Sequence, residues 1–181
     1  MQRIIVTGAT SMIGVALIEE CIKHGTEVYA VVREGSKKRS RLPESSLIKF
    51  ADCSLEHLDR LPEMISQECD TFYHIAWGNT GENRNSSTEL QSRNIGYTLA
   101  AVKAAAALGC KRFIGAGSQA EYGLLDLDRI SPESAANPTT PYGAAKLASG
   151  YLARMLCKEL GIECIWPRIF SVYGIYEKET T

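Results

Sequence analysis

A glycine-bearing turn near the N-terminus places the strongest constraint on the fold of this 181-residue chain. The apolar segment Arg3–Thr7 runs directly into the sequence TGATSMIG, residues 7–14, and a helical pattern follows. Gly8 allows a sharp turn off the strand, and Gly14 allows the helix to pack closely on a sheet. The N–H groups at the start of that helix then form a site for a pyrophosphate. The turn therefore predicts a strand–turn–helix unit that binds a dinucleotide.

Apolar segments alternate with helical patterns along the rest of the chain, which is typical of a parallel sheet built from βαβ units. Segments rich in Val, Ile and Phe predict strands at 3–7, 27–32, 47–50, 71–75, 112–116 and 163–167. Helical patterns lie near 12–24, 55–66, 88–108 and 142–160, and Gly25, Gly109 and Gly161 follow three of them as left-handed C-terminal caps. We expect a single α/β domain over residues 1–181, with a Rossmann-type doubly wound parallel sheet.

The composition excludes several classes of partner. Lys and Arg number 20 against 21 Asp and Glu, and so near-neutral a chain lacks the basic excess of nucleic-acid-binding proteins. No apolar run approaches the ~20 residues that span a bilayer, and the N-terminus lacks a signal-peptide pattern. The six cysteines include no Cys-x-x-Cys pair, so we expect scattered buried thiols and no metal site. These features predict a cytoplasmic protein with no membrane or nucleic-acid partner.

The end of the second strand indicates which dinucleotide is bound. NAD-binding units place an acidic residue there to bind the ribose hydroxyls, but this chain has Val32 followed by Arg33. A guanidinium suits a 2′-phosphate, and Lys37, Lys38 and Arg39 add positive charge just beyond. We expect NADP to be preferred, with NAD as the alternative.

A tyrosine–lysine pair supplies candidate catalytic groups. Tyr142 and Lys146 are separated by four positions at the start of a predicted helix, so their side chains share one helix face. A nearby ammonium favours the phenolate, and we therefore expect a lowered pKa for Tyr142, as a general acid/base requires.

Together with the glycine turn, this pair resembles the extended short-chain dehydrogenase/reductase family, whose members include NAD-dependent epimerases, dehydratases and ketoreductases of nucleotide sugars. The resemblance covers essentially all 181 residues. Ser11 replaces the middle glycine of the family's TGxxGxxG turn, and Ser171 replaces the asparagine of its R-x-F-N-x-Y-G segment. Other family-like segments are Ala51-Asp52-Cys53, His74-Ile75-Ala76, Asn94–Thr98, Gly117–Gly123 and Pro167–Gly174.

The resemblance implies a role for each matching residue. Ser118, Tyr142 and Lys146 would form a catalytic triad, in which Tyr142 exchanges a proton with the sugar oxygen while hydride moves to or from the nicotinamide. The expected cofactor contacts are Gly8, Thr10, Ser11, Met12, Ile13, Gly14, Arg33, Asp52, Cys53, Ala76, Tyr142, Lys146 and Ile169. The expected substrate contacts are Asn94, Ser118, Gln119 and Ser171.

The resemblance also narrows the reaction. The family's 4,6-dehydratases carry an Asp-Glu pair directly after the catalytic Ser/Thr, whereas this chain has Gln119 and Ala120. We therefore expect a 4-ketoreductase or a 4-epimerase acting on a nucleotide sugar.

The sequence ends seven residues after Gly174, and the family's C-terminal substrate lobe is expected to be largely absent. The alternative function is thus a truncated cofactor-binding remnant without turnover. Family dimers form through two helices per subunit, which correspond here to 88–108 and 142–160, so a homodimer is also expected.

Overall fold

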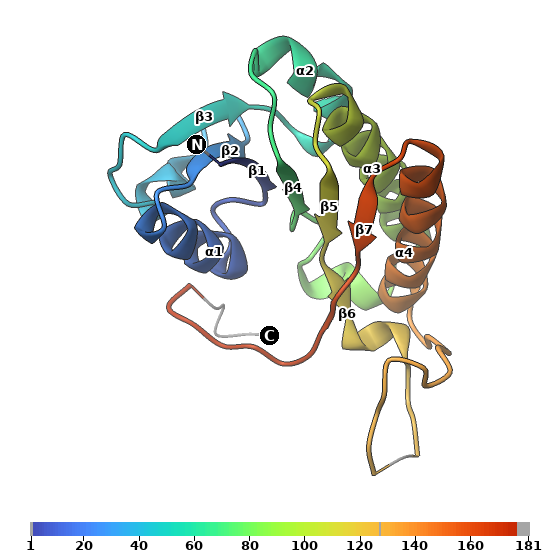
Figure 1. Ribbon diagram of the computed structural model, residues 1–181. Coiled ribbons are helices and arrows are strands. Elements are labelled where there is room, and N and C mark those ends of the chain that lie inside the picture. The colour runs from blue at the N-terminus through green and yellow to red at the C-terminus, as the bar shows by residue number, and fades with distance from the viewer. Residues whose placement is uncertain (1, 127, 177–181) are drawn as a thin grey trace.

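The computed structural model describes residues 2–126 and 128–176, and it shows a parallel sheet with helices on both faces (Figure 1). The sheet has six strands in the order β3-β2-β1-β4-β5-β7, and every adjacent pair is parallel. This order confirms the predicted Rossmann-type fold. The strands are β1 Arg3–Thr7, β2 Glu27–Val32, β3 Ile48–Asp52, β4 Thr71–His74, β5 Arg112–Gly115 and β7 Glu163–Ile165. The helices are α1 Met12–Lys23, α2 Leu61–Met64, α3 Thr88–Ala107 and α4 Pro141–Glu159.

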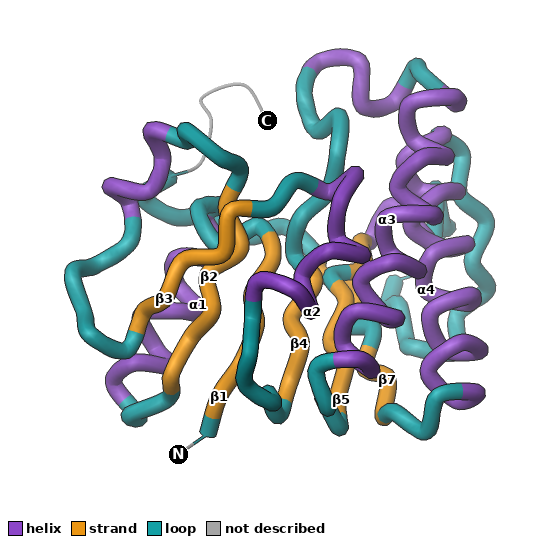
Figure 2. The backbone as a smooth tube through the Cα atoms, turned by 90° about the horizontal axis from the view of Figure 1, so that it is seen from above, coloured by secondary structure: helices purple, strands orange, loops and turns teal. Residues whose placement is uncertain are grey.

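One face of the sheet is covered by α3 and α4, which pack side by side (Figure 2). The strand register places Tyr29, Ile5, Phe72 and Phe113 in one row across β2, β1, β4 and β5. All four side chains are buried in the larger core cluster, together with small residues of α3 and α4 such as Ala101. Alanines on the helices let the backbones approach the sheet closely, so this face carries most of the core.

The opposite face is covered only in part, by α1. Its row runs from Phe50 on β3 through Ala30, Val6 and Tyr73 to Ile114 and Ile165 on β7. Ala30 and Val6 lie beneath α1 and are fully buried. Phe50 and Ile165, at the two ends of the row, are 45% and 39% exposed.

One local prediction was wrong, and one small sheet was not predicted. The helix expected over 55–66 is a 3-10 segment, Leu55–Arg60, followed by the four-residue α2. Pro62 has no N–H to donate to the preceding turn, and His57 has non-helical dihedral angles, so a continuous helix does not form. The structure also contains a second, two-stranded sheet that was not predicted, in which β6 Gly117–Ser118 pairs with β8 Arg168–Ile169. Two-residue strands have no periodicity that a sequence pattern could reveal.

Candidate dinucleotide and catalytic site

The turn between β1 and α1 requires both of its glycines. Gly8 has a φ of 69°, and a Cβ there would lie 2.7 Å from the Ala76 nitrogen. A Cβ at Gly14 would overlap the Gly8 carbonyl oxygen. The close approach of helix, strand and the β4 loop therefore depends on these two positions, as predicted.

Ser11, the substitution within this turn, is the N-cap of α1. Its Oγ accepts a hydrogen bond from the Gly14 N–H at 3.1 Å, and its own N–H donates to the Gly8 carbonyl at 2.9 Å. Within the described residues, the N–H groups of Met12 and Ile13 have no hydrogen-bond partner. These two donors and the positive end of α1 form a fitting site for a phosphate group.

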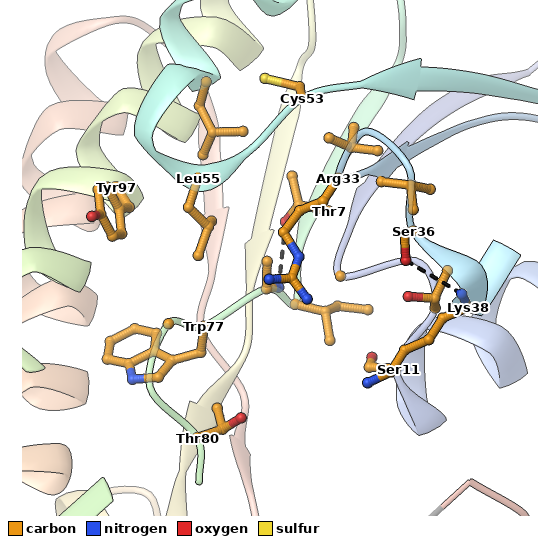
Figure 3. A pocket seen from close by; sticks show the side chains of 18 of the residues that line it. Thr7, Ser11, Arg33, Ser36, Lys38, Cys53, Leu55, Trp77, Thr80 and Tyr97 are labelled. Carbon is orange, nitrogen blue, oxygen red and sulfur yellow. Dashed lines mark hydrogen bonds between the residues drawn. The ribbon is translucent and has the colours of Figure 1, made fainter. Parts of the chain in front are cut away.

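A cavity of about 650 Å³ lies against this turn, at the carboxyl ends of β1, β2 and β4 (Figure 3). Its volume is within the range of pockets that hold cofactors. Seven of the predicted cofactor contacts line it, namely Gly8, Thr10, Ser11, Met12, Arg33, Cys53 and Ala76. Gly8 has no side chain to block the cavity, and the unpaired N–H groups of the turn can bind a phosphate. The site therefore fits a dinucleotide.

Basic side chains enter the cavity from the β2 side. Figure 3 shows Arg33 extending into it from the end of β2, and Lys38 reaching toward Ser11. Arg41 also lines the cavity, where it donates to the Thr10 carbonyl at 3.2 Å and its guanidinium lies 4.7 Å from the ring centroid of Tyr176. These cations give this end of the cavity a positive potential that suits phosphates.

Asp52 is not among the residues that line the cavity, and its expected contact with the cofactor stays a prediction. Its carboxylate forms an ion pair with Arg39, which turns both side chains to each other. Cys53, the next residue, remains on the cavity wall.

The three predicted catalytic residues come from two elements. Ser118 ends β6, while Tyr142 and Lys146 lie in the first turns of α4, whose N-cap Thr140 binds the Gly143 N–H at 3.1 Å. Lys146 is 4% exposed, and its Nζ donates to the Ala116 carbonyl at 2.6 Å. Burial lowers the pKa of Lys146 to about 7, although the Glu121 carboxylate partly opposes this.

The expected lowering of the Tyr142 pKa is wrong for this structure. Burial raises the pKa of Tyr142, while a hydrogen bond with Ser118 and the charge of Arg84 only partly oppose the rise. Lys146 does not lower it because its ammonium is directed to the Ala116 carbonyl and lies 5.9 Å from the centroid of the Tyr142 ring.

A buried carboxylate, Glu121, fixes the position of Ser118. Its Oε1 accepts from the Ser118 N–H at 2.9 Å and from Trp166 Nε1 at 3.0 Å, and its Oε2 accepts from Arg168 Nε at 2.8 Å. Arg168 is on β8, so this one carboxylate connects both strands of the small sheet. The indole of Trp166 packs against three glycines, Gly115, Gly117 and Gly150.

The remaining predicted residues lie outside the cavity. Asn94 is buried, and its amide binds the Gly78 backbone through an N–H···Oδ1 bond of 2.7 Å and an Nδ2–H···O bond of 3.2 Å. It therefore fastens the loop after β4 to α3, and its expected substrate contact stays a prediction. Ile169 pairs with Ser118 in the small sheet, whereas Gln119 and Ser171 are exposed at the ends of its strands. Ile13 and Gly14 are in the first turn of α1 and are not among the residues that line the cavity, although the Ile13 N–H is one of the two unpaired donors at the turn.

Several cavity residues were not predicted. They include Arg41 from the segment after β2, Tyr97 from α3, and Trp77 from the loop after β4. Lys38, which the sequence indicated only as added positive charge, also lines the cavity. The sequence assigned no cofactor contact to these residues, because loop conformation and helix orientation bring them to the cavity. Across 2–126 and 128–176, no cluster of three or more residues could ligate a metal, and no helix could span a membrane.

The sheet order and the glycine turn define this protein as an α/β protein of the Rossmann type, with its cavity at the carboxyl edge of the strands. Residues 4–181 match the NAD dependent epimerase/dehydratase family, and the chain belongs to this family. The predicted resemblance to extended short-chain dehydrogenases/reductases is thereby confirmed.

Relatives with known activities act on nucleotide sugars. UDP-glucose 4-epimerase of Corynebacterium glutamicum is 24% identical over 177 residues, which are 97% of this chain and 53% of the relative. The dTDP-6-deoxy-L-talose 4-dehydrogenase (NAD(+)) of Aggregatibacter actinomycetemcomitans is 28% identical over 145 residues, 80% of this chain and 52% of the relative. The chain thus spans about half the length of these curated relatives.

The fold is also that of a solved epimerase. The crystal structure of UDP-glucuronic acid 4-epimerase from Bacillus cereus, in complex with UDP-glucuronic acid and NAD, has a TM-score of 0.81 at 22% identity. The match covers 99% of this chain and 60% of that one.

Proposed function

We propose that this chain binds NAD(P) and acts on a nucleotide sugar, by hydride transfer at a sugar carbonyl or hydroxyl. One observation carries the proposal: Trp77 lines the cavity at the β1–α1 turn and is in direct contact with Tyr142 and Lys146. A cofactor bound along the turn would thus have the proton-transferring groups at its far end.

Each catalytic group has a role that its surroundings support. Tyr142 exchanges a proton with the reacting sugar oxygen, and Ser118 hydrogen-bonds the same oxygen. Lys146 binds the nicotinamide ribose, and its pKa of about 7 lets it give up or accept a proton near neutral pH. The nicotinamide supplies the hydride acceptor or donor that these side chains cannot provide.

The reaction we favour is 4-ketoreduction or 4-epimerisation. A dehydratase needs acidic groups after Ser118 to eliminate water, and Gln119 and Ala120 occupy those positions. Two of the relatives, a 4-epimerase and a 4-dehydrogenase, are named for chemistry at the 4-position.

NADP is the cofactor that the charges of the cavity favour. Arg33 and Lys38 line it just beyond β2, and that strand ends in Val32 instead of an acidic residue that would repel a 2′-phosphate. NAD is the alternative, favoured by the relative named for NAD(+) and by the epimerase solved with NAD.

Calorimetric titration with NADPH and with NADH tests the site and the preference together. We expect NADPH to bind more tightly, and Arg33→Leu to weaken NADPH binding about tenfold or more, because a charge-assisted bond to the 2′-phosphate is lost. The same substitution should leave NADH binding nearly unchanged. Arg129→Leu, which removes an exposed arginine of the loop before α4, is the matched control. Equal or tighter binding of NADH would contradict the NADP preference, and binding of neither would contradict the dinucleotide site.

The alternative function is a cofactor-binding module without turnover. The chain spans about half of its relatives, so the residues that hold the sugar in those proteins need not all be present here. Oxidation of NADPH on addition of a 4-keto sugar nucleotide would support the enzyme. Tight cofactor binding without any sugar-dependent oxidation would support the binding module.

A further inference from the structure

Trp77 separates the cavity from the candidate catalytic residues. The indole lines the cavity, whereas Ser118, Tyr142 and Lys146 do not. The Lys146 ammonium lies 3.7 Å from the centroid of the indole ring, on its face. The Tyr142 ring meets the indole edge-on, at 6.0 Å between centroids and an angle of 85°. A ligand entering from the β1–α1 turn would therefore reach Trp77 before it reached Lys146 or Tyr142.

The indole is held in this position from α3. Trp77 Nε1 donates to Gln91 Oε1 at 2.8 Å, and the fully buried Gln91 donates through Nε2 to the Asn79 carbonyl at 2.9 Å. Gly78, between them, is bound to Asn94. The backbone that follows Trp77 is thus fixed to α3, while among the described residues the indole itself is retained by one hydrogen bond, by the ammonium on its face and by the edge contact with Tyr142.

A bound ligand could replace the interactions that hold the Trp77 indole. The Lys146 ammonium is a strong donor with one carbonyl partner at 2.6 Å, and a ribose hydroxyl could replace the indole as its second neighbour. The indole N–H makes a neutral hydrogen bond, which is weak compared with a charge-assisted one. Rotation of the indole away from Lys146 would connect the cavity with Tyr142 without any movement of the sheet or of α4.

We propose that Trp77 is the gate of the nicotinamide end of this site, with its indole covering Lys146 until the ribose of a dinucleotide displaces it. This inference rests on the proposed function, because it requires a dinucleotide in the cavity. Trp77 is a positioning residue in this scheme: it controls access to Lys146 and Tyr142 and keeps water from them when the gate is closed.

The accessibility of Lys146 tests the closed gate without any cofactor. An amine-reactive acylating reagent is added to the folded chain, and labelling of Lys146 is followed by mass spectrometry of its peptide. We expect labelling about tenfold faster in Trp77→Ala than in the wild type, because the face of the indole no longer shields Nζ. Tyr97→Ala removes another aromatic side chain from the cavity wall and should leave the labelling rate unchanged.

The kinetics of cofactor binding test the opening. The chain has two tryptophans, so Trp166→Phe leaves Trp77 as its only source of indole emission. On rapid mixing with NADPH or NADH, we expect the observed rate of the emission change to reach a plateau as the nucleotide concentration rises, because displacement of the indole is a unimolecular step whose rate does not depend on the nucleotide concentration. Trp77→Ala, followed through nucleotide emission, should show a linear dependence with no plateau.

The outcomes separate this inference from the proposed function. Unchanged Lys146 labelling in Trp77→Ala, or a linear rate in the protein with Trp77, would overturn the gate while a bound dinucleotide still supported the function. Absence of dinucleotide binding in both proteins would overturn the function and the gate with it. The labelling experiment does not need the Trp166→Phe substitution, so it still tests the gate if Trp166→Phe does not fold.

Discussion

At the scale of single residues, burial sets the protonation state of the groups around the candidate site. His74 is fully enclosed beside the Thr7 hydroxyl, with 2.9 Å between Nδ1 and Oγ1, and burial lowers the pKa of this histidine to about 3. Lys146, 4% exposed, has its pKa lowered to about 7 by the same cause. The nearby carboxylate of Glu121 opposes the shift of Lys146 without cancelling it. These values lead to a pH dependence of stability that can be measured.

We expect Lys146→Met to stabilise the fold most at neutral and lower pH. Between about pH 10.5 and pH 7 the unfolded chain binds a proton at Lys146 that the folded chain does not, so the stability of the wild type falls as the pH falls through this window. The methionine variant lacks this effect. Urea unfolding of both proteins at about pH 7 and about pH 10 should show that the difference between them changes by a few kcal/mol.

An exposed lysine of α3 provides the comparison. Lys103→Met removes the same charge from a solvated position, so its effect should be small and nearly independent of pH. A difference between wild type and Lys146→Met that stayed constant from neutral to alkaline pH would contradict the lowered pKa.

At the scale of elements, the same substitution should have opposite effects at two helical glycines. Gly14→Ala places a Cβ against the Gly8 carbonyl, and we expect a loss of about 1–3 kcal/mol in the free energy of unfolding, together with weaker dinucleotide binding. Gly96→Ala, in α3, should gain up to about 1 kcal/mol, because within the described residues no atom lies within 4 Å of its Cβ position. Thermal unfolding of the two variants compares them directly. Equal effects of the two substitutions would show that α1 is not in close contact with the turn.

The long elements could be predicted from the sequence, and the reasons are local. Strands β1 and β2 are buried on both faces or nearly so, which makes them continuous apolar segments, and α3 and α4 begin and end at capping residues. Residues of the glycine turn were predicted to meet a cofactor because the motif itself determines their geometry.

The parts that could not be predicted depend on tertiary contacts. The pairing of β6 with β8 depends on the buried Glu121, whose partners Trp166 and Arg168 are more than 40 positions away. The contact of Trp77 with Lys146 is also tertiary, because Trp77 is in the loop after β4 and Lys146 is in α4. The pKa of Tyr142 is raised by burial, and the four-residue spacing of Tyr142 and Lys146 gives no information about burial.

At the scale of the whole molecule, the sheet is covered unevenly. One face carries α3 and α4 over β4, β5 and β7, with the segment from Leu55 to Met64 packed beside α3, whereas α1 covers the other face only over β1 and β2 (Figure 2). Tyr73, Ile114 and Ile165 continue the apolar row beyond α1, and Ile165 is 39% exposed on the edge strand β7. The homodimer expected through α3 and α4 stays a prediction.

We expect this 181-residue chain to bind a hydrophobic dye and to associate as its concentration rises, because apolar side chains on the open face are in contact with water. Ile165→Lys should reduce both effects, since it places a charge on the edge strand. Leu124→Lys changes an exposed leucine of the loop before α4 and should reduce neither. Light scattering over a concentration series and dye fluorescence measure the two effects. A monomer at every concentration, with no dye binding, would contradict the expectation.

The packing of Trp166 has a consequence for how this sequence can vary. A Cβ at Gly115 would overlap the indole, and one at Gly117 or Gly150 would lie 2.6 or 2.7 Å from Trp166 Nε1. Three glycines from β5, β6 and α4 thus accommodate one large side chain, so the four positions are not independent. A methyl group at any of the three glycines requires a smaller residue at position 166. That smaller residue would no longer donate to Glu121, and the carboxylate that fixes Ser118 would lose a partner. Among natural variants of this chain, these positions should therefore change together or not at all.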